Sequence, residues 1–172
     1  MSPYENLPDT QWKKVTKKLV NEHPLSSDIL IDTVLEAWNG ILKTKIADEL
    51  QIGRDIFPTP QILGNYLHEL IPVFLEKKYP GQWTRDIEKK DKDLVCVANP
   101  YYSVEIKTSS NANNIYGNAS YGQEDSASAS SKTKDGYYLA VNFEKFNPSN
   151  KNFIPRIRKI RFGWLDHSDW HS

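Results

Sequence analysis

Three charged side chains lie close together in the stretch "DKDLVCVANPYYSVEIKTSS", residues 91–110, which contains two strand-like runs. Asp93 stands where the first apolar run begins, and Glu105 and Lys107 stand two residues apart in the second run. Because side chains alternate between the faces of a strand, Glu105 and Lys107 share a face. A tight turn between the runs would make them antiparallel neighbours, with Asp93 across from Glu105 or Lys107. We therefore expect two carboxylates and one ammonium to converge near one edge of a sheet.

Such a group could hold a divalent metal and hydrolyse a phosphodiester. Hard cations such as Mg²⁺ take oxygen ligands and are commonly held by one or two carboxylates together with a phosphate. A cation would also relieve the repulsion between two neighbouring carboxylates. The Lys107 ammonium is expected to contact the attacking water or the phosphate, where it orients or deprotonates the nucleophile. The alternative is a surface ion-pair cluster, because charged pairs often lie on the solvent-exposed face of an element without a further role.

The Glu-x-Lys spacing is weak evidence by itself, because the chain contains it three times. Glu76-Lys77-Lys78 and Glu88-Lys89-Lys90 stand in strongly charged surroundings, whereas Glu105-Ile106-Lys107 has an apolar centre in a strand-like run. An aspartate on the preceding run adds weight to the third. Asp91 competes for the role of that aspartate, since alternation puts it on the same face, but it lies outside the apolar run and we favour Asp93.

The elements that must position these residues are helices in the first half of the chain and strands in the second. A short helix is expected to run to about Val20, and a longer one from Ser26 or Ser27 to Gly53, on the i, i+3, i+4 spacing of their apolar residues. A third helix starts at Thr59-Pro60, with proline in its first turn and a further proline, Pro72, inside it.

Five strands are expected after the helices, with a tight turn at Asn99-Pro100 between the second and third. Their expected ranges are Trp83–Ile87, Asp93–Ala98, Tyr101–Thr108, Tyr137–Phe143 and Ile157–Leu165. We predict an α/β (α+β) fold in which a central mixed β-sheet is flanked by helices, with a helical N-terminal half. One domain is expected over residues 1–172, with a helical part at 1–57 and a core at 58–172 that carries a polar insertion at 109–135.

Composition limits the class of protein. The chain has 172 residues and 38% hydrophobic residues, which suits one globular domain. Its formal net charge is zero, so overall charge indicates no partner. The single cysteine, Cys96, excludes a disulfide within the chain. No stretch resembles a signal peptide or a membrane span, and we expect a cytoplasmic protein without a membrane partner.

At the charged strands the chain resembles the PD-(D/E)XK nuclease superfamily. Its signature is an aspartate near the start of one strand and Glu/Asp-x-Lys on the next. The resemblance implies that Asp93 and Glu105 bind Mg²⁺ and that Lys107 is the catalytic lysine. Lys92 stands where the signature has proline, a position at which the superfamily often departs from its pattern. A restriction-endonuclease-like core is the fold that this resemblance implies.

The segments "SPYENLPDTQW" and "VEIKTSSNANNIYGNASYGQ" are similar to the ScaI-type restriction enzymes. This narrower resemblance implies a Type II restriction endonuclease. Such an enzyme would be a Mg²⁺-dependent homodimer that cuts both strands of a short palindromic site in double-stranded DNA.

Many members of the superfamily add an acidic ligand from the helix before the core strands, and Glu69 is the candidate. Ile62, Tyr66, Glu69 and Val73 fall at i, i+4, i+7 and i+11, so they form one helical stripe that we expect to face the sheet. A glutamate on that stripe needs a partner such as a metal. Alternatively, Glu69 lies at the edge of the stripe and reaches water. His68 is expected to point elsewhere.

Two segments are candidates for DNA contact. Asparagine and glutamine can bond adenine, and serine can bond base edges, so the polar insertion after Lys107 is a candidate reader of bases. Its candidates are Ser109, Asn111, Asn113, Asn114, Tyr116, Asn118 and Gln123. The basic segment 151–164 is a candidate for phosphate contacts. Its candidates are Arg156, Arg158 and Arg161.

Other functions remain open at this point. The chain could be a DNA-binding module without hydrolytic activity, or a repair or structure-specific nuclease of the same superfamily. It could also be a protein-interaction domain, given five tryptophans and nine tyrosines, although most aromatic residues fill cores. The terminal "DHSDWHS", residues 166–172, could hold a transition metal, but its spacing matches no established zinc pattern.

Overall fold

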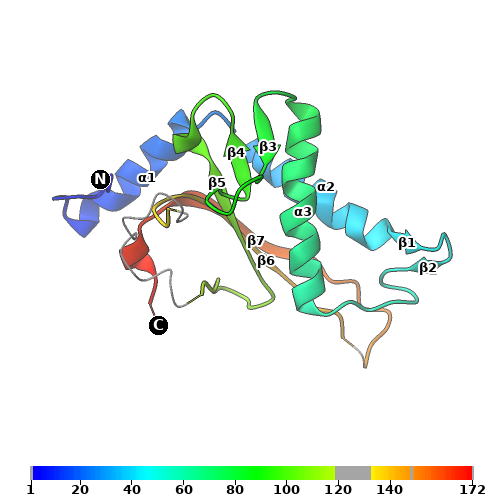
Figure 1. Ribbon diagram of the computed structural model, residues 1–172. Helices are drawn as coiled ribbons and strands as arrows, with labels where there is room; N and C mark the ends of the chain where they lie inside the picture. The colour runs from blue at the N-terminus through cyan, green and yellow to red at the C-terminus, as the bar shows by residue number, and fades with distance from the viewer. Residues whose placement is uncertain (1, 119–132, 148, 172) are drawn as a thin grey trace.

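Three helices pack against a five-stranded sheet in the computed structural model, which describes residues 2–118, 133–147 and 149–171 (Figure 1). The helices are α1 (Asp9–Glu22), α2 (Ser27–Lys43) and α3 (Pro60–Lys78). Both termini lie at the end of the molecule where α1 lies, away from the hairpin that follows α2. The predicted fold class, a mixed sheet flanked by helices, is confirmed.

The second helix is shorter than predicted. It begins as expected, with the Ser26 side chain accepting a hydrogen bond from the Ile29 amide at 3.3 Å, but it ends at Lys43 rather than at Gly53. A small antiparallel hairpin follows, formed by β1 (Lys45–Ile46) and β2 (Leu50–Gln51). Ala47 and Asp48 turn the chain between the two strands with φ values of 55° and 59°. That left-handed backbone is incompatible with a continuing right-handed helix.

The predicted inward stripe of α3 is wrong by one residue. The buried side of the helix carries Leu63, Gly64, Leu67, Ile71, Pro72 and Leu75. Ile62 and Tyr66 are 45% and 37% exposed, and Glu69 is exposed as well. Aliphatic side chains recur every fourth residue on the adjacent face, at Leu63, Leu67, Ile71 and Leu75, and their burial decides which face of the helix points to the core.

The sheet has the strand order β3-β4-β5-β6-β7, and all five predicted strands form, with β5 ending and β6 beginning one residue outside the expected range. Among the described strands of this sheet only β5 and β6 pair in parallel, which the long insertion between them permits. The strands are β3 (Trp83–Arg85), β4 (Leu94–Cys96), β5 (Val104–Ser109), β6 (Gly136–Phe143) and β7 (Ile157–Leu165).

The tight turn predicted at Asn99-Pro100 is a short 3-10 helix instead, η1 (Pro100–Tyr102). Asn99 precedes it, and its side-chain oxygen accepts a hydrogen bond from the Tyr101 amide at 3.1 Å. The proline supplies the φ that the first position of a helical turn requires. The strands on either side are antiparallel neighbours, as expected.

The hydrophobic core lies between the helices and one face of the sheet. Val104 and Ile106 of β5 and Leu139 and Val141 of β6 are fully buried in it. Because side chains alternate along a strand, Glu105 and Lys107 project from the opposite face of β5. The core therefore fixes the orientation of the charged pair.

A buried histidine ends the first helix. His23 is 6% exposed and contacts the rings of Tyr102, Tyr137 and Phe162. Its Nε2 donates to the Tyr102 carbonyl at 2.9 Å, and its Nδ1 accepts from the Leu25 amide at 3.1 Å. Burial lowers the pKa of His23, against the opposite influence of its carbonyl contacts. The ring therefore packs as a neutral group.

None of the helices in the described part of the chain combines the length and the apolar character that crossing a lipid bilayer requires.

Candidate active site

Asp93 and Glu105 come together across β4 and β5. Leu94 pairs with Val104 in the antiparallel register, which sets Asp93, one residue earlier, beside Glu105. The Asp93 carboxylate reaches across the gap, where its Oδ2 accepts a hydrogen bond from the Ile106 amide at 2.7 Å. The side chain is 19% exposed. The Asp93 carboxylate, just before β4, is thus fixed against β5, the strand that carries the Glu105 carboxylate.

Glu105 and Lys107 form a nearly buried ion pair. Lys107 Nζ lies 2.8 Å from Glu105 Oε1, and the two side chains are only 14% and 3% exposed. A carboxylate so far from water needs a counter-charge. The Glu88–Lys90 pair has the same sequence spacing and a similar distance of 2.9 Å, but its side chains are 62% and 52% exposed. Burial therefore distinguishes the third Glu-x-Lys from a solvated one.

Asp91, the competing aspartate, holds a turn instead. Its Oδ2 accepts hydrogen bonds from the amides of Ile87 and Glu88 at 3.1 and 2.9 Å. These contacts turn its carboxylate back toward the loop that precedes β4. Asp93 is the aspartate that contacts β5.

His68 of α3 reaches this site, contrary to the prediction that it points elsewhere. Its Nδ1 lies 3.6 Å from Asp93 Oδ2, and its side chain is 32% exposed. The next residue, Glu69, lies about 100° further around the helix and is exposed. The predicted stripe placed Glu69 toward the strands, whereas His68 is the residue that lies there. His68 lies one helical turn after Gly64 and one before Pro72, both of which are buried, and the sequence pattern did not indicate this burial.

The donor atoms suit a hard divalent cation. Asp93 and Glu105 offer carboxylate oxygens, which Mg²⁺ prefers, on adjacent positions of neighbouring strands. Within the described ranges no group of three or more His, Cys, Asp and Glu side chains gathers in a way that could hold a metal. Two carboxylates are few ligands, but Mg²⁺ usually keeps several waters and binds phosphate oxygens as well. The residues present therefore fit a cation shared with DNA.

The first part of the polar insertion is a compact turn on the sheet. Asn111 Oδ1 accepts hydrogen bonds from the amides of Asn113 and Asn114, and Ser109 Oγ accepts one from the Asn111 amide at 3.0 Å. Tyr116 is 63% exposed and its hydroxyl accepts from Asn111 Nδ2 at 3.1 Å. Asn118 is exposed, and Gln123 lies outside the described residues.

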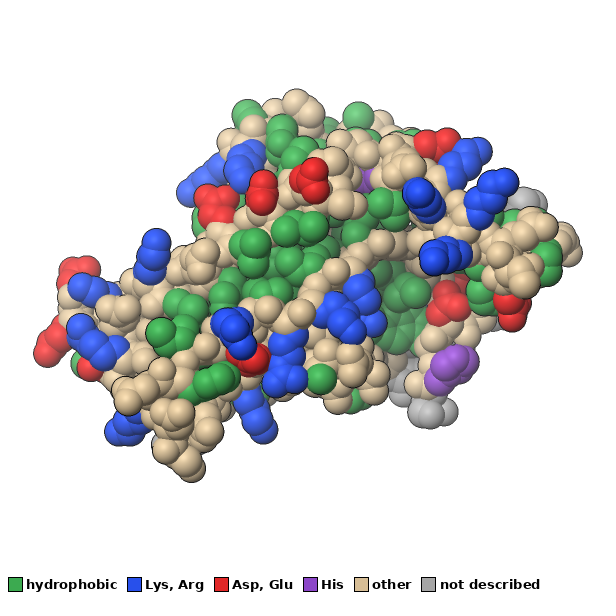
Figure 2. Space-filling view, turned by 180° about the vertical axis from the view of Figure 1, so that it is seen from behind, with side chains coloured by type: hydrophobic (Ala, Val, Ile, Leu, Met, Phe, Trp, Pro, Cys, Tyr) green, Lys and Arg blue, Asp and Glu red, His purple; other side chains and the backbone are tan. Residues whose placement is uncertain are grey.

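The three predicted phosphate-binding arginines have different surroundings. Arg156 lies 3.5 Å from Glu144 and Arg158 is exposed on β7. Arg161 Nη2 donates to the Asn113 carbonyl at 2.6 Å and to Asn142 Oδ1 at 2.8 Å. Figure 2 shows Lys and Arg side chains on both sides of a central group of hydrophobic ones on the face seen from behind.

Two buried polar residues near the site were missed by the sequence analysis as functional candidates. Asn142 of β6 is fully buried, and an amide within the apolar run "YYLAVNF" was an available signal. Lys92 is 7% exposed and donates from Nζ to the carbonyls of Thr133 and Asp135 at 3.0 and 3.2 Å. A side chain on Gly136, where φ is 144°, would collide with Lys92. Lys92, in the position of the signature's proline, thus anchors the returning end of the insertion.

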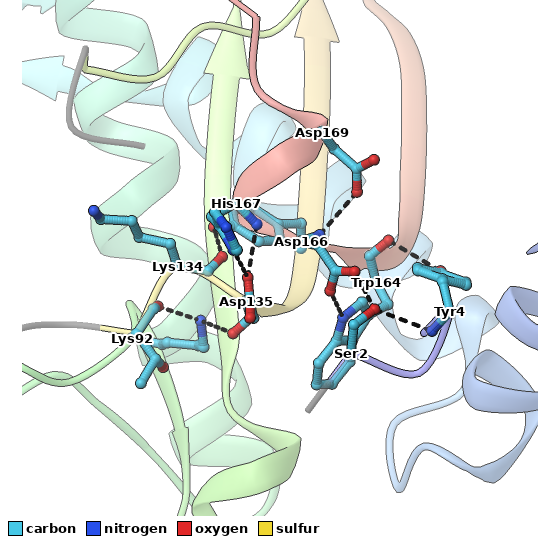
Figure 3. A network of polar contacts seen from close by, with 11 residues as sticks. Ser2, Tyr4, Lys92, Lys134, Asp135, Trp164, Asp166, His167 and Asp169 are labelled. Atoms are coloured by element: carbon cyan, nitrogen blue, oxygen red, sulfur yellow. Dashed lines mark hydrogen bonds and ion pairs between the residues drawn. The ribbon is translucent and has the colours of Figure 1, made fainter. Parts of the chain in front are cut away.

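The C-terminal acids and histidine serve local structure. Asp166 accepts from Trp164 Nε1 at 2.7 Å and from Ser2, while its own amide donates to Asp169 Oδ2 at 2.8 Å. In Figure 3 the Asp135 carboxylate faces His167, whose amide donates to Asp135 Oδ1 at 2.6 Å. These contacts join the two ends of the chain. In the part of the chain that the structure describes, they form no metal-binding cluster.

Comparisons with known proteins bear on this site. The model of the ScaI restriction endonuclease family matches residues 2–172. The Type II restriction enzyme ScaI of Streptomyces caespitosus is 46% identical over 169 residues, which are 98% of this chain and 73% of the relative. No solved structure gives a significant match.

Proposed function

The chain belongs to the ScaI restriction endonuclease family, and from this premise we propose that Asp93, Glu105 and Lys107 form its catalytic centre. The reaction is hydrolysis of DNA phosphodiester bonds at a short palindromic site, with Mg²⁺ as the cofactor. The observation that carries the proposal is the near-burial of the Glu105–Lys107 pair on the strand that Asp93 contacts.

Each of the three residues has its own task. Asp93 and Glu105 would hold Mg²⁺, which when bound activates water and stabilises charge on the phosphate. Asp93 keeps its orientation through the Ile106 amide. Lys107 pairs with Glu105 in the free protein and would be available to orient the attacking water if a bound cation neutralised Glu105 instead. His68 supports Asp93 from α3.

The enzyme is proposed to act as a homodimer in the cytoplasm. A palindromic site has two-fold symmetry, and cutting both strands needs two catalytic centres related by the same symmetry. Two copies of the 19.8 kDa chain would sediment at about twice that mass. A strictly monomeric protein on cleaved DNA would contradict this part of the proposal.

The test compares two lysines of the same sequence pattern. Plasmid DNA and Mg²⁺ are incubated with the wild-type protein, with Lys107→Ala and with Lys90→Ala, whose lysine forms the exposed pair with Glu88. We expect discrete fragments from the wild type and from Lys90→Ala, and a rate at least about a hundredfold lower for Lys107→Ala. Chelation should abolish cleavage.

The outcomes separate the alternatives. A smear in place of discrete fragments would indicate a structure-specific nuclease of the same superfamily. A DNA mobility shift without cleavage would indicate a binding module. Undiminished cleavage by Lys107→Ala would refute the assignment of the site while leaving the family intact.

A further inference from the structure

We propose that the turn Asn111–Asn114 is a preformed DNA-reading element in which Asn114 contacts an adenine of the recognised site. Asn142 is the positioning residue that holds this turn. The inference rests on the proposed function, because it concerns the DNA that the enzyme cuts. It assigns different roles to asparagines that the sequence presents as equivalent candidates.

Asn111 is occupied in folding the turn. Its Oδ1 accepts from the amides of Asn113 and Asn114 at 2.9 and 3.0 Å, and its Nδ2 donates to the Tyr116 hydroxyl. A side-chain oxygen that accepts from amides two and three residues later closes a tight local turn. Asn111 therefore shapes the backbone and has little hydrogen-bonding capacity left for a base.

The Asn142 side chain, on β6, binds that turn to the sheet. Its Nδ2 donates to the carbonyls of Asn111 and Asn114, both at 2.9 Å, and its Oδ1 accepts from Arg161 at 2.8 Å. The residue has no exposed surface. A buried amide whose donors and acceptor are bonded fixes its partners strongly, because breaking any one bond leaves a buried polar group unsatisfied. The two ends of the turn are thus held by one side chain.

Asn113 is also engaged. Its Oδ1 accepts from Lys159 Nζ at 2.7 Å, and its carbonyl accepts from Arg161 at 2.6 Å. Asn114 remains as the asparagine of the turn whose side chain is exposed and makes no hydrogen bond to the described residues. A side-chain amide of this kind can form two hydrogen bonds with adenine N6 and N7 in the major groove.

The turn lies on the catalytic face of the sheet. Residues directly opposite in the register share a face, and the register pairs Lys107 with Ala140 and Ser109 with Asn142. On β7 it pairs Ala140 with Arg161. The residues that hold the turn therefore share a face with Lys107, and Asn142 lies about 7 Å further along the sheet. That distance corresponds to about two base-pair steps of DNA.

Fixing the turn before DNA arrives has a consequence for recognition. A flexible loop must be ordered on binding, and that ordering opposes association. The turn Asn111–Asn114 is already ordered in the free protein, where hydrogen bonds to other protein groups hold it. Asn114 is therefore presented in one orientation, which favours one base at one position.

The experiment measures selectivity base by base. The recognised site is found by sequencing fragment ends from the wild-type protein, and kcat/KM is then measured on duplexes in which each adenine is replaced in turn. We expect Asn114→Ala to reduce discrimination at one adenine position by about tenfold to a hundredfold and to leave the other positions unchanged. Asn39→Ala, at an exposed asparagine of α2, is the control and should change none.

Asn142→Ala tests the positioning role. We expect it to reduce discrimination at the same adenine, and the double variant Asn142→Ala/Asn114→Ala to be no less selective than either single variant. A residue that merely supports the fold would lower cleavage at all sites equally and add to the effect of Asn114→Ala. If Asn142→Ala does not fold, Asn114→Ala alone decides the proposal.

A binding measurement separates this inference from the proposed reaction. Duplexes bound in Ca²⁺ are selected from a random pool and sequenced, which requires no cleavage. Specific binding by the wild type with unchanged preference in Asn114→Ala would overturn the inference and leave the nuclease proposal intact. A wild-type site without adenine would also overturn the inference. Wild-type protein that neither binds nor cuts specifically would overturn both.

Discussion

At the scale of single residues, burial separates the candidate catalytic lysine from its counterparts. Lys107 and Glu105 lie almost out of water, whereas Lys90 and Glu88 form an equally short pair at the surface. Surface pairs contribute little to stability, and a buried pair costs desolvation. The buried Glu105–Lys107 pair therefore costs desolvation free energy, and it lies on the strand that Asp93 contacts. The proposed catalytic role explains why a buried charged pair is present there.

Exchanging the two aspartates for asparagine distinguishes their roles. We expect Asp93→Asn to lower the cleavage rate at least about a hundredfold, because the proposed metal site would lose a charged ligand. Asp91→Asn should cut normally and lose about 1 kcal/mol of unfolding free energy, because a neutral amide oxygen accepts the two amides of the preceding loop more weakly than a carboxylate does. Single-turnover cleavage and urea unfolding measure the two effects. The reverse result would transfer the metal to Asp91.

His68 and Glu69 form a second matched pair. We expect His68→Ala to slow cleavage by about tenfold to a hundredfold, since residues that orient a metal ligand typically have effects of this size. Glu69→Ala should be within about twofold of the wild type, because the side chain is exposed on α3. Metal titrations of both variants provide an independent readout. A larger effect from Glu69→Ala would restore it as the acidic ligand.

At this scale the sequence identifies residue types better than their surroundings. Asp93, Glu105 and Lys107 could be selected from alternation and an apolar centre. His68 could not be selected once the helical stripe was placed one residue off. Asn142 is distinguishable in the sequence as an amide within an apolar run, but only the fold shows that two loop carbonyls and Arg161 contact it.

At the scale of elements, α3 packs closely on β5, and this packing holds His68 of α3 near Asp93. A Cβ on Gly64 would lie 2.7 Å from Thr108 Oγ1. We expect Gly64→Ala to destabilise the protein by about 1–3 kcal/mol through this overlap, although alanine is the better helix former. Gly64→Ala/Thr108→Ala should recover most of the loss. Urea unfolding of the wild type and three variants completes the cycle, and simple additivity would contradict the packing argument.

The buried His23 makes stability depend on pH in a defined direction. Its pKa is lowered by burial, so the unfolded chain takes up a proton before the folded one does. The contribution of His23 to the free energy of unfolding is full above about pH 6.5. It falls as the pH drops below that value, by at most about 1.4 kcal/mol per pH unit.

Replacing the ring tests this. His23→Gln keeps a donor for the Tyr102 carbonyl and does not titrate, so we expect a flatter pH dependence between pH 7.5 and 5.5 than in the wild type. His171→Gln, at an exposed position, should leave the slope unchanged. Equal slopes for His23→Gln and the wild type would show that another group dominates.

Elements were predicted well where a hydrophobic period continues over many residues. The helices and strands of the core follow from it, since burial of apolar side chains decides them. The end of α2 did not, because neither the extended Thr44 that follows the helix nor the left-handed Ala47 and Asp48 of the next turn carries a strong sequence signal. The parallel pairing of β5 with β6 also depends on how a long insertion returns, which local pattern cannot specify.

At the scale of the whole molecule, one sheet combines two opposed requirements. Its core face packs against helices and fixes the strands, and its other face carries Glu105 and Lys107 together with the turn held by Asn142. Contacts of Ser2 with Asp166 and of Asp135 with His167 tie the chain ends to this frame. The proposed catalytic residues and the proposed reader of bases are thus positioned by the same strands.

The most direct test locates the metal. Crystals of the protein with DNA containing its recognised site and Mn²⁺ would reveal the ion by its anomalous scattering. We expect an ion coordinated by the carboxylates of Asp93 and Glu105 and by an oxygen of the scissile phosphate, with Lys107 turned from Glu105 toward the attacking water. An ion bound by other side chains, with Lys107 still paired to Glu105 in the DNA complex, would contradict it.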